Sequence, residues 1–177
     1  ADGAEGSMCG NGGRCLVQFA WDLGIRPSMI SFIAIDGPHL ASVASTKVSL
    51  KMQDVEGISN LGNDSLLNTG SPHYIRLVKN LQDLDVYNEG RSIRYNQQFA
   101  EKGVNVNFTE LQGPSHIAVR TYERGVEDET FSCGTGVTAA AIVCFGQQPG
   151  QHSVEITTMG GALSVDFEFD GSRYSNV

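Results

Sequence analysis

A four-residue pattern, Cys-Gly-x-Gly, occurs twice in this chain, and each copy is followed by an apolar stretch of helical character. The copies begin at Cys9 and Cys133, 124 residues apart. The similarity extends beyond the pattern, because Trp21 falls opposite Phe145 at the same offset. Self-similarity at a fixed offset is typical of a duplicated structural unit. The sequence therefore predicts two related halves, each built around a glycine-opened helix.

A β-hairpin is expected after each helix. The stretches SFIAIDGPHLASV and VEITTMGGALSV alternate β-forming residues around a tight turn, at Asp36-Gly37 and at Gly160-Gly161. Each half is thus predicted to be a helix followed by a hairpin. The two hairpins align at an offset of 123 through three pairs of residues: Ile33 with Ile156, Gly37 with Gly160, and Leu40 with Leu163.

The two predicted helices differ in how apolar they are. The first is predicted over residues 12–23 and ends at Gly24, with Pro27 just beyond. The second is predicted over residues 136–145 and is apolar nearly all round, so it should be buried within strands. The apolar residues that recur at helical spacing in the first helix are Leu16, Phe19, Ala20 and Leu23.

Strands that could surround the second helix are available along the chain. A further helix or turn is expected at the surface, within residues 80–96. The predicted fold class is α+β, with two pseudo-symmetric domains, each a curled, mainly antiparallel, barrel-like sheet around a central helix, and an active site in the cleft between them. The stretches of strand composition, besides the hairpins, are residues 47–52, 74–78, 104–110, 117–122 and 165–169.

A boundary between the two domains is predicted near Gly57. The segment of residues 53–68 is polar and rich in glycine, which makes it the best candidate for a crossing between the halves. The division assigns residues 1–57 to the remainder of an N-terminal domain. It assigns residues 58–177 to a C-terminal domain.

The negative charge of the chain argues against nucleic acid and anionic membranes as partners. Its formal net charge is −8, which disfavours binding to nucleic acid or to an anionic membrane. The longest stretch without a charged residue, residues 131–154, is interrupted by glycines and a proline. Its apolar part is too short to span a bilayer, so it is better read as a buried helix.

The spacing of the four cysteines argues against a metal site or a disulfide framework. Cys9 and Cys15, like Cys133 and Cys144, are poorly spaced for zinc, and no histidine lies close enough in sequence to complete a site. Reduced thiols in a cytoplasmic protein are therefore expected. Cys15 and Cys144 lie inside the predicted helices, where we expect them to be buried and not catalytic.

A cysteine at the start of a helix has unusual chemistry. The first N–H groups of a helix have no backbone partner, and the helix dipole puts partial positive charge there. These groups stabilise a thiolate and can bind a carboxylate. If Cys9 and Cys133 face each other, one thiolate could remove an α-proton while the other thiol protonates the opposite face, without a cofactor. The alternative is that both patterns are ordinary turns with inert, buried cysteines.

Four stretches, in order, carry a resemblance to a known family. ADGxExxMCGNGxRC at residues 1–15 and ERGVEDETFSCGTG at residues 123–136 resemble the signature regions of diaminopimelate epimerase. TGSPHY at residues 69–74 and GVNVNF at residues 103–108 are similar to two further blocks of that family. The resemblance implies a cofactor-independent isomerase that interconverts LL- and meso-diaminopimelate in lysine and cell-wall precursor biosynthesis. It implies a small-molecule substrate and a cytoplasmic location, and it leaves a homodimer open.

The resemblance also implies roles for individual residues. Cys9 and Cys133 match the two catalytic acid/base cysteines. His73 and Glu123 match catalytic-site residues close to the reacting centre, and Glu123 would contact the reacting amino group of the substrate. The groups implied to bind substrate are Asn105 and Arg124 at the distal carboxylate, Ser71 where many members have asparagine, and Gly10, Asn11, Gly12, Gly134, Thr135 and Gly136 at the two helix ends.

The chain departs from the family pattern at its two ends. The family usually has a further N-terminal stretch, beginning near a GNDF-type segment, and an asparagine directly before the position of Ala1. The family's final strand, which returns to the first domain, would lie beyond Val177. The resemblance therefore implies a chain truncated at both ends.

Two other functions stay open at this point. A proline racemase or hydroxyproline epimerase shares the fold and the two-cysteine chemistry. Its proline-type substrate has no distal amino-acid end for Arg124 and Asn105 to bind, which argues against it. A non-enzymatic thiol- or metal-binding module would instead make Cys9 and Cys133 structural residues.

Overall fold

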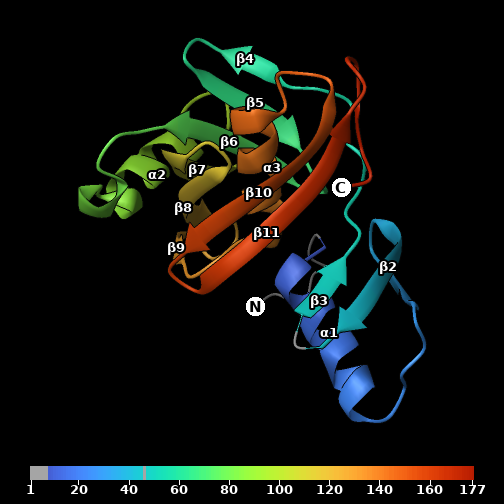
Figure 1. Ribbon diagram of the computed structural model, residues 1–177. Coiled ribbons are helices and arrows are strands. Elements are labelled where there is room, and N and C mark those ends of the chain that lie inside the picture. The colour runs from blue at the N-terminus through green and yellow to red at the C-terminus, as the bar shows by residue number, and fades with distance from the viewer. Residues whose placement is uncertain (1–7, 46) are drawn as a thin grey trace.

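The computed structural model describes residues 8–45 and 47–177 of the chain, which form two lobes (Figure 1). The first seven residues of the motif at residues 1–15 lie outside this range. We call residues 8–50 the small lobe and residues 59–177 the large lobe. The small lobe packs one helix against a three-stranded antiparallel sheet. Its elements are α1 (Gly10–Asp22), β1 (Ile30–Ala34), β2 (Gly37–Ala44) and β3 (Lys47–Leu50).

The large lobe is built on a nine-stranded sheet that curls around one helix. The strand order is β12-β11-β10-β8-β7-β6-β5-β4, with β9 paired to β8. The pairs β10–β8 and β6–β7 are parallel, and the other pairs are antiparallel, so the sheet is mixed. The strands are β4 (Ser59–Leu61), β5 (Asp64–Asn68), β6 (Pro72–Leu77), β7 (Asn105–Gly113), β8 (His116–Glu123), β9 (Asp128–Thr130), β10 (Gly150–Thr158), β11 (Gly161–Phe169) and β12 (Tyr174–Ser175).

The enclosed helix is α3 (Gly134–Phe145), which Figure 1 shows inside the curl of the sheet. Every residue of α3 from Gly134 to Ile142 is buried. The three alanines in this stretch have no exposed surface at all, and such small side chains let strands approach the helix closely. The helix ends where Gly146 meets the ring of Tyr174, whose hydroxyl donates to the Gly146 carbonyl at 3.0 Å. The prediction of a buried helix wrapped by strands is confirmed.

The opposite face of the sheet is covered by α2 (Val86–Arg94) and by a 3-10 helix, η1 (Leu81–Asp83). Strand β7 shows how the two faces divide. Val106 and Phe108 point into the α2 side and are fully buried with Tyr122 of β8. The alternate residues Asn105 and Asn107 therefore point to the α3 side, because successive side chains of a strand leave opposite faces.

Several local predictions are confirmed. The predicted hairpins are β1–β2 and β10–β11, but each turn lies one residue earlier than predicted, at Ile35-Asp36 and at Met159-Gly160. Both cysteine-led helices begin two residues earlier than predicted, at Gly10 and Gly134. They do so because Cys9 and Cys133 are themselves the N-cap residues, and an N-cap stands directly before the first helical residue.

The predicted crossing between the halves is shorter than expected. Within residues 53–68, strands β4 and β5 form a hairpin that belongs to the large sheet. The connection itself is residues 51–58, where Val55 bridges Tyr174 through two backbone hydrogen bonds of 2.8 and 2.9 Å. Gly57 lies in this connection, and the division into domains at that position stays a prediction.

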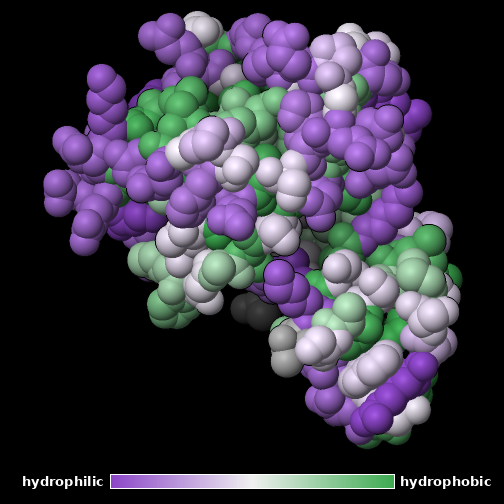
Figure 2. Space-filling model, in the orientation of Figure 1, coloured by the Kyte–Doolittle hydropathy of each residue, from purple (hydrophilic) through white to green (hydrophobic). Residues whose placement is uncertain are grey.

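Most of the apolar residues that recur along α1 are exposed, although in a helix that packs on a core they would be buried. Val17 is fully buried, but Leu16, Phe19 and Leu23 are 49%, 61% and 65% exposed. In Figure 2 the small lobe carries more apolar surface than the mostly hydrophilic face of the large lobe. The helical spacing predicted the helix correctly, but in the described structure α1 packs through Gly13 and Val17 instead. No helix among the described residues is long and apolar enough to cross a membrane.

The contact between α2 and β8 leads to a prediction about stability. A Cβ atom at Gly90 would overlap the Cβ of Tyr122 and lie 2.7 Å from its Cγ. We expect Gly90→Ala to lower the free energy of unfolding by about 1–3 kcal/mol, although alanine favours a helix more than glycine. Urea unfolding would measure this change. Gly57→Ala is the control, because nothing lies within 4 Å of its Cβ position, and equal stability of the two variants would contradict the prediction.

Candidate active site

The N-terminal ends of α1 and α3 meet directly through two glycines. A Cβ atom at Gly10 would lie 3.2 Å from the Cα of Gly134, and a Cβ at Gly134 would lie 3.1 Å from the Cα of Gly10. These neighbours are backbone atoms, which cannot turn aside as a side chain can. A side chain at either position would therefore push the two backbones apart by a few tenths of an ångström, which favours glycine after both cysteines.

A chain of polar contacts reinforces the junction. The Nδ2 of Asn11 on α1 donates to the carbonyl of Ser132, next to Cys133, at 2.8 Å. Its Oδ1 accepts from the guanidinium of Arg14. The same guanidinium lies beside the junction, with Nη1 3.4 Å from the Cβ position of Gly134. The helix ends are thus held by a backbone contact and by side chains that cross it.

Cys9 and Cys133 occupy matching positions on the two helices. Their backbone angles agree closely, at φ −110° and ψ 112° for Cys9 and φ −119° and ψ 111° for Cys133. The Sγ of Cys9 accepts from the Gly12 N–H at 3.4 Å. Cys9 is exposed, however, whereas Cys133 is only 9% exposed. The two thiols therefore share a geometry but differ in their contact with water.

The junction is suited to binding an anion. Each helix directs the N–H groups of its first turn and partial positive charge toward its own start. Neither helix has an acidic residue in its first turn that would neutralise this charge. The Arg14 guanidinium adds a full positive charge nearby. A carboxylate held there would lie beside the thiols that cap the helices.

Burial and neighbouring groups act in opposite directions on Cys133. Burial raises the pKa of its thiol, because it disfavours the charged thiolate. The carboxylate of Glu123 also raises this pKa, whereas the hydroxyl of Thr135, 3.4 Å from the sulfur, and the Gly136 N–H lower it. Burial is the largest of these effects, so Cys133 is a thiol at neutral pH.

Beneath Cys133 lies a buried network of polar side chains. The Nε2 of His73 is 2.9 Å from both the hydroxyl of Ser71 and the hydroxyl of Thr135. Its Nδ1 lies 3.0 Å from Nδ2 of Asn107. His73 and Asn107 are fully buried. The structure therefore places His73 behind Thr135, one hydrogen-bonded group away from the Cys133 sulfur.

His73 is held neutral by its surroundings. Complete burial is the main cause, with a smaller contribution from the positive charge of Arg124, and together they lower its pKa from 6.5 to about 3. A neutral imidazole donates from one ring nitrogen and accepts at the other. His73 can therefore take part in a directional chain of hydrogen bonds at any ordinary pH.

The predicted distal-carboxylate residues also lie together. The side-chain oxygen of Asn105 accepts from the backbone N–H of Arg124 at 2.9 Å. Its side-chain nitrogen donates to the Ser71 hydroxyl at 3.3 Å. The guanidinium of Arg124 donates to the Lys102 carbonyl at 3.0 Å. Glu123, at the end of β8, accepts from the hydroxyl of Thr130 at 2.9 Å. These side chains thus continue from the Cys133 network along the ends of β6, β7 and β8.

The structure brings most of the predicted site residues into one region. The glycines and Asn11 lie at the helix junction, Cys133 and Thr135 adjoin it, and His73 and Ser71 lie behind it. Their roles toward a substrate stay predictions. Sequence reasoning missed Asn107, although its spacing from Asn105 in VNVNF puts both on one face of a strand.

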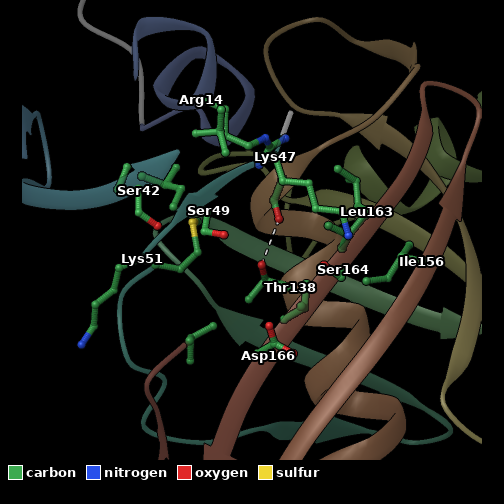
Figure 3. Close-up of a pocket in the computed structure, with 18 of the residues that line it drawn as sticks. Arg14, Ser42, Lys47, Ser49, Lys51, Thr138, Ile156, Leu163, Ser164 and Asp166 are labelled. Atoms are coloured by element: carbon green, nitrogen blue, oxygen red, sulfur yellow. Dashed lines mark hydrogen bonds between the residues drawn. The ribbon is translucent and has the colours of Figure 1, made fainter. Parts of the chain in front are cut away.

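A cavity adjoins the helix junction, where Arg14 and Gly134 line it. It measures about 980 Å³ and opens between β2 and β3 of the small lobe and β10 and β11 of the large lobe (Figure 3). Arg14, Lys47, Thr138 and Asp166 line it, but neither Cys9 nor Cys133 does. No group of three or more metal-ligating side chains occurs within residues 8–45 and 47–177.

The low pKa of His73 makes stability depend on pH. As the pH falls below 6.5, the unfolded chain binds a proton at this histidine, but the folded chain does not do so until about pH 3. Stability is therefore lost over this range, by about 1.4 kcal/mol per pH unit from this group. We expect His73→Gln to flatten the pH dependence of the free energy of unfolding between pH 6.5 and 4. His152→Gln on β10 controls for the loss of a histidine, and an unchanged slope in His73→Gln would refute the prediction.

Comparison with known proteins agrees with this geometry. The family model described as diaminopimelate epimerase matches residues 65–177. The diaminopimelate epimerase of Flavobacterium psychrophilum is 45% identical over 179 residues, covering all of this chain and 70% of the relative. That of Chlorobaculum tepidum is 46% identical over 153 residues, covering 82% of this chain and 60% of the relative. The chain thus spans about 60 to 70% of the length of these relatives.

Solved structures share the fold at low sequence identity. A phenazine biosynthesis protein of the PhzF family from Bacillus anthracis has a TM-score of 0.74 at 11% identity, covering 97% of this chain and 72% of that chain. A hydroxyproline epimerase from Agrobacterium vitis has a TM-score of 0.67 at 14% identity, covering 95% and 62%. The α+β fold class is confirmed by these likenesses. The resemblance carried by the four sequence motifs is confirmed by the family model and the relatives: the chain belongs to the diaminopimelate epimerase family of isomerases.

Proposed function

We propose that this protein interconverts LL- and meso-diaminopimelate by proton transfer between Cys9 and Cys133, without a cofactor. The observation that carries the proposal is the junction of two cysteine-capped helix ends through Gly10 and Gly134. It combines two thiols with two sets of N–H groups that suit a carboxylate. The choice of diaminopimelate as the substrate is based on the relatives that are named diaminopimelate epimerase.

The reaction needs one proton removed and one delivered. The thiolate of one cysteine takes the α-proton, and the electron pair of the broken C–H bond moves into the carboxylate, which becomes enolate-like. The N–H groups of the two helix ends stabilise this charge. The pair then returns to the α-carbon and forms a new C–H bond with the proton of the second thiol, on the opposite face. The first cysteine ends as a thiol and the second as a thiolate.

The environments of the two cysteines suggest how the cycle begins. Burial raises the pKa of Cys133, so this residue starts as the thiol and is the acid. Cys9, which is exposed and accepts an N–H hydrogen bond, is then the base. Because each turnover exchanges the two protonation states, the reverse direction uses the same residues in the opposite roles.

The remaining polar groups fit a substrate with two amino-acid ends. Glu123 is proposed to contact the reacting amino group, with Asn105, Arg124 and Ser71 close to the distal carboxylate. These three residues are hydrogen-bonded into one group at the strand ends. A proline-type substrate has no distal end to use such a group. This favours diaminopimelate over proline, although a hydroxyproline epimerase shares the fold.

The setting of the enzyme is part of the proposal. Two reduced thiols are required, which fits the cytoplasm, where lysine and cell-wall precursors are made. The quaternary state, a monomer or a homodimer, would follow from light scattering of the purified protein.

Isotope exchange tests the proposed reaction. The protein incubated with LL-diaminopimelate in deuterated water should incorporate deuterium at the α-carbon and form the meso isomer, and L-proline should not exchange. Cys9→Ala and Cys133→Ala should each reduce epimerisation by at least about a hundredfold, because each removes one proton-transfer group. Exchange into proline alone would indicate a proline racemase. A zinc assay that finds one tightly bound ion per chain would support a metal-binding module instead.

The junction itself can be tested by a single methyl group. Gly134→Ala would push the backbone of α1 away from α3, so we expect epimerisation to fall by at least about tenfold, in line with the cost of misplacing catalytic groups. The variant should still fold, because α3 is held mainly by the large sheet. Gly113→Ala is the matched control, since its Cβ would make only an ordinary contact of 3.7 Å with His116. Full activity in a folded Gly134→Ala variant would show that the close junction is not needed.

A further inference from the structure

Asn107 lies in the GVNVNF block but was itself assigned no role, yet it is fully buried at the centre of the network behind Cys133. We propose that Asn107 is a positioning residue, which holds His73 in the tautomer with its hydrogen on Nε2 and thereby directs the hydroxyl hydrogen of Thr135 to the Cys133 sulfur. The significance of this for catalysis rests on the proposed function. The hydrogen-bond directions themselves do not.

The orientation of the Asn107 amide is fixed by its surroundings. Its Nδ2 faces three acceptors: Nδ1 of His73 at 3.0 Å, the Tyr74 carbonyl at 3.2 Å and the Asn105 carbonyl at 3.4 Å. Its Oδ1 accepts from the hydroxyl of Thr121 at 3.0 Å. A flipped amide would turn its oxygen toward two backbone carbonyls, which cannot donate. The NH₂ group therefore faces His73, and Nδ1 is the acceptor.

The tautomer of His73 follows from this contact. An imidazole that is neutral and accepts at Nδ1 carries its hydrogen on Nε2. That hydrogen lies between the hydroxyls of Ser71 and Thr135, each 2.9 Å from Nε2. Arg124 is the charged group that acts on His73, and its positive charge opposes a second proton on the ring.

The hydroxyl of Thr135 connects His73 to the sulfur of Cys133. Its oxygen accepts from His73, so its own hydrogen is free to point to Sγ of Cys133 at 3.4 Å. Ser71, 3.3 Å from the same oxygen, receives a hydrogen from Asn105 and can donate its own to Thr135. A hydroxyl donor stabilises a thiolate. It counters the effects of burial and of the Glu123 carboxylate on Cys133, which also has the Cys9 side chain nearby.

The first turn of α3 packs so closely on Asn107 that there is no space for a side chain at Gly136. A Cβ atom at Gly136 would overlap Oδ1 of Asn107. The glycine thus lets the helix that carries Cys133 rest directly on the amide that orients His73. Thr69 adds a further constraint, because its hydroxyl donates to the Thr135 carbonyl at 2.8 Å.

The first test uses the unmodified protein. Nitrogen-15 NMR of the histidine rings distinguishes the two tautomers, and we expect His73 to carry its hydrogen on Nε2 and to keep Nδ1 unprotonated from pH 8 down to pH 5. In Asn107→Asp, a carboxylate replaces the donor, so Nδ1 of His73 should become protonated. A hydrogen on Nδ1 in the unmodified protein would overturn the proposal without any variant.

The second test follows Cys133 itself. The rate of its alkylation by iodoacetamide against pH, read from the mass of its peptide, reports the thiolate and needs no substrate. We expect the midpoint to rise by about one pH unit in Thr135→Val, which is a tenfold loss of thiolate at neutral pH, and to be restored in Thr135→Ser. Asn107→Asp should raise it by a similar amount.

Thr109→Val is the matched control. Thr109 lies on β7 two residues beyond Asn107, is equally buried, and its hydroxyl has no hydrogen-bond partner in the described structure. This variant should leave the Cys133 midpoint unchanged. An unchanged midpoint in Asn107→Asp would overturn the proposal even if the protein epimerises diaminopimelate. If the protein does not epimerise it but the tautomer and midpoints are as expected, only the proposed function fails.

Discussion

The site depends on the direct contact between the starts of two helices. Two helix N-termini carry partial positive charge of the same sign, so bringing them together costs electrostatic energy unless an anion lies between them. Gly10 and Gly134 make the approach sterically possible, and Asn11 holds it through Ser132. The same contact brings two N-capping cysteines to one place. An unfavourable arrangement of backbone dipoles thus becomes a reason for the site to bind a carboxylate.

The rest of the large lobe supports one of these two helices. The curled sheet buries α3 almost completely, and this burial removes water from Cys133. A thiol in such a place would be inert without polar support. The alternation of β7 supplies that support, because its odd-numbered residues carry asparagines toward α3 while its even-numbered residues fill the apolar core on the α2 side. The apolar core and the buried polar network thus lie on opposite faces of a single strand.

Much of this arrangement could be predicted from the sequence, because it depends on patterns of residues that are close together in the chain. The glycine-opened helices and the two hairpins follow from residues close together in each copy of the repeat. Asn107 could not be assigned, since its role depends on His73 and Thr121 of neighbouring strands. The exposure of the apolar face of α1 could not be predicted either, because helical spacing predicts a helix but not what packs against it. Residues 59–68 were misread as a connection because their strands are short and polar.

The bridge between Val55 and Tyr174 has a consequence for the order in which the molecule assembles. The connection between the lobes is held by residues that come much later in the sequence, including Val177, whose carbonyl accepts from the Met52 N–H at 2.8 Å. During synthesis, domains form from the N-terminal side as the chain emerges. The small lobe would thus leave the ribosome long before the residues that anchor its connection. The contacts that anchor its connection therefore cannot form until Tyr174 and Val177 have been synthesised.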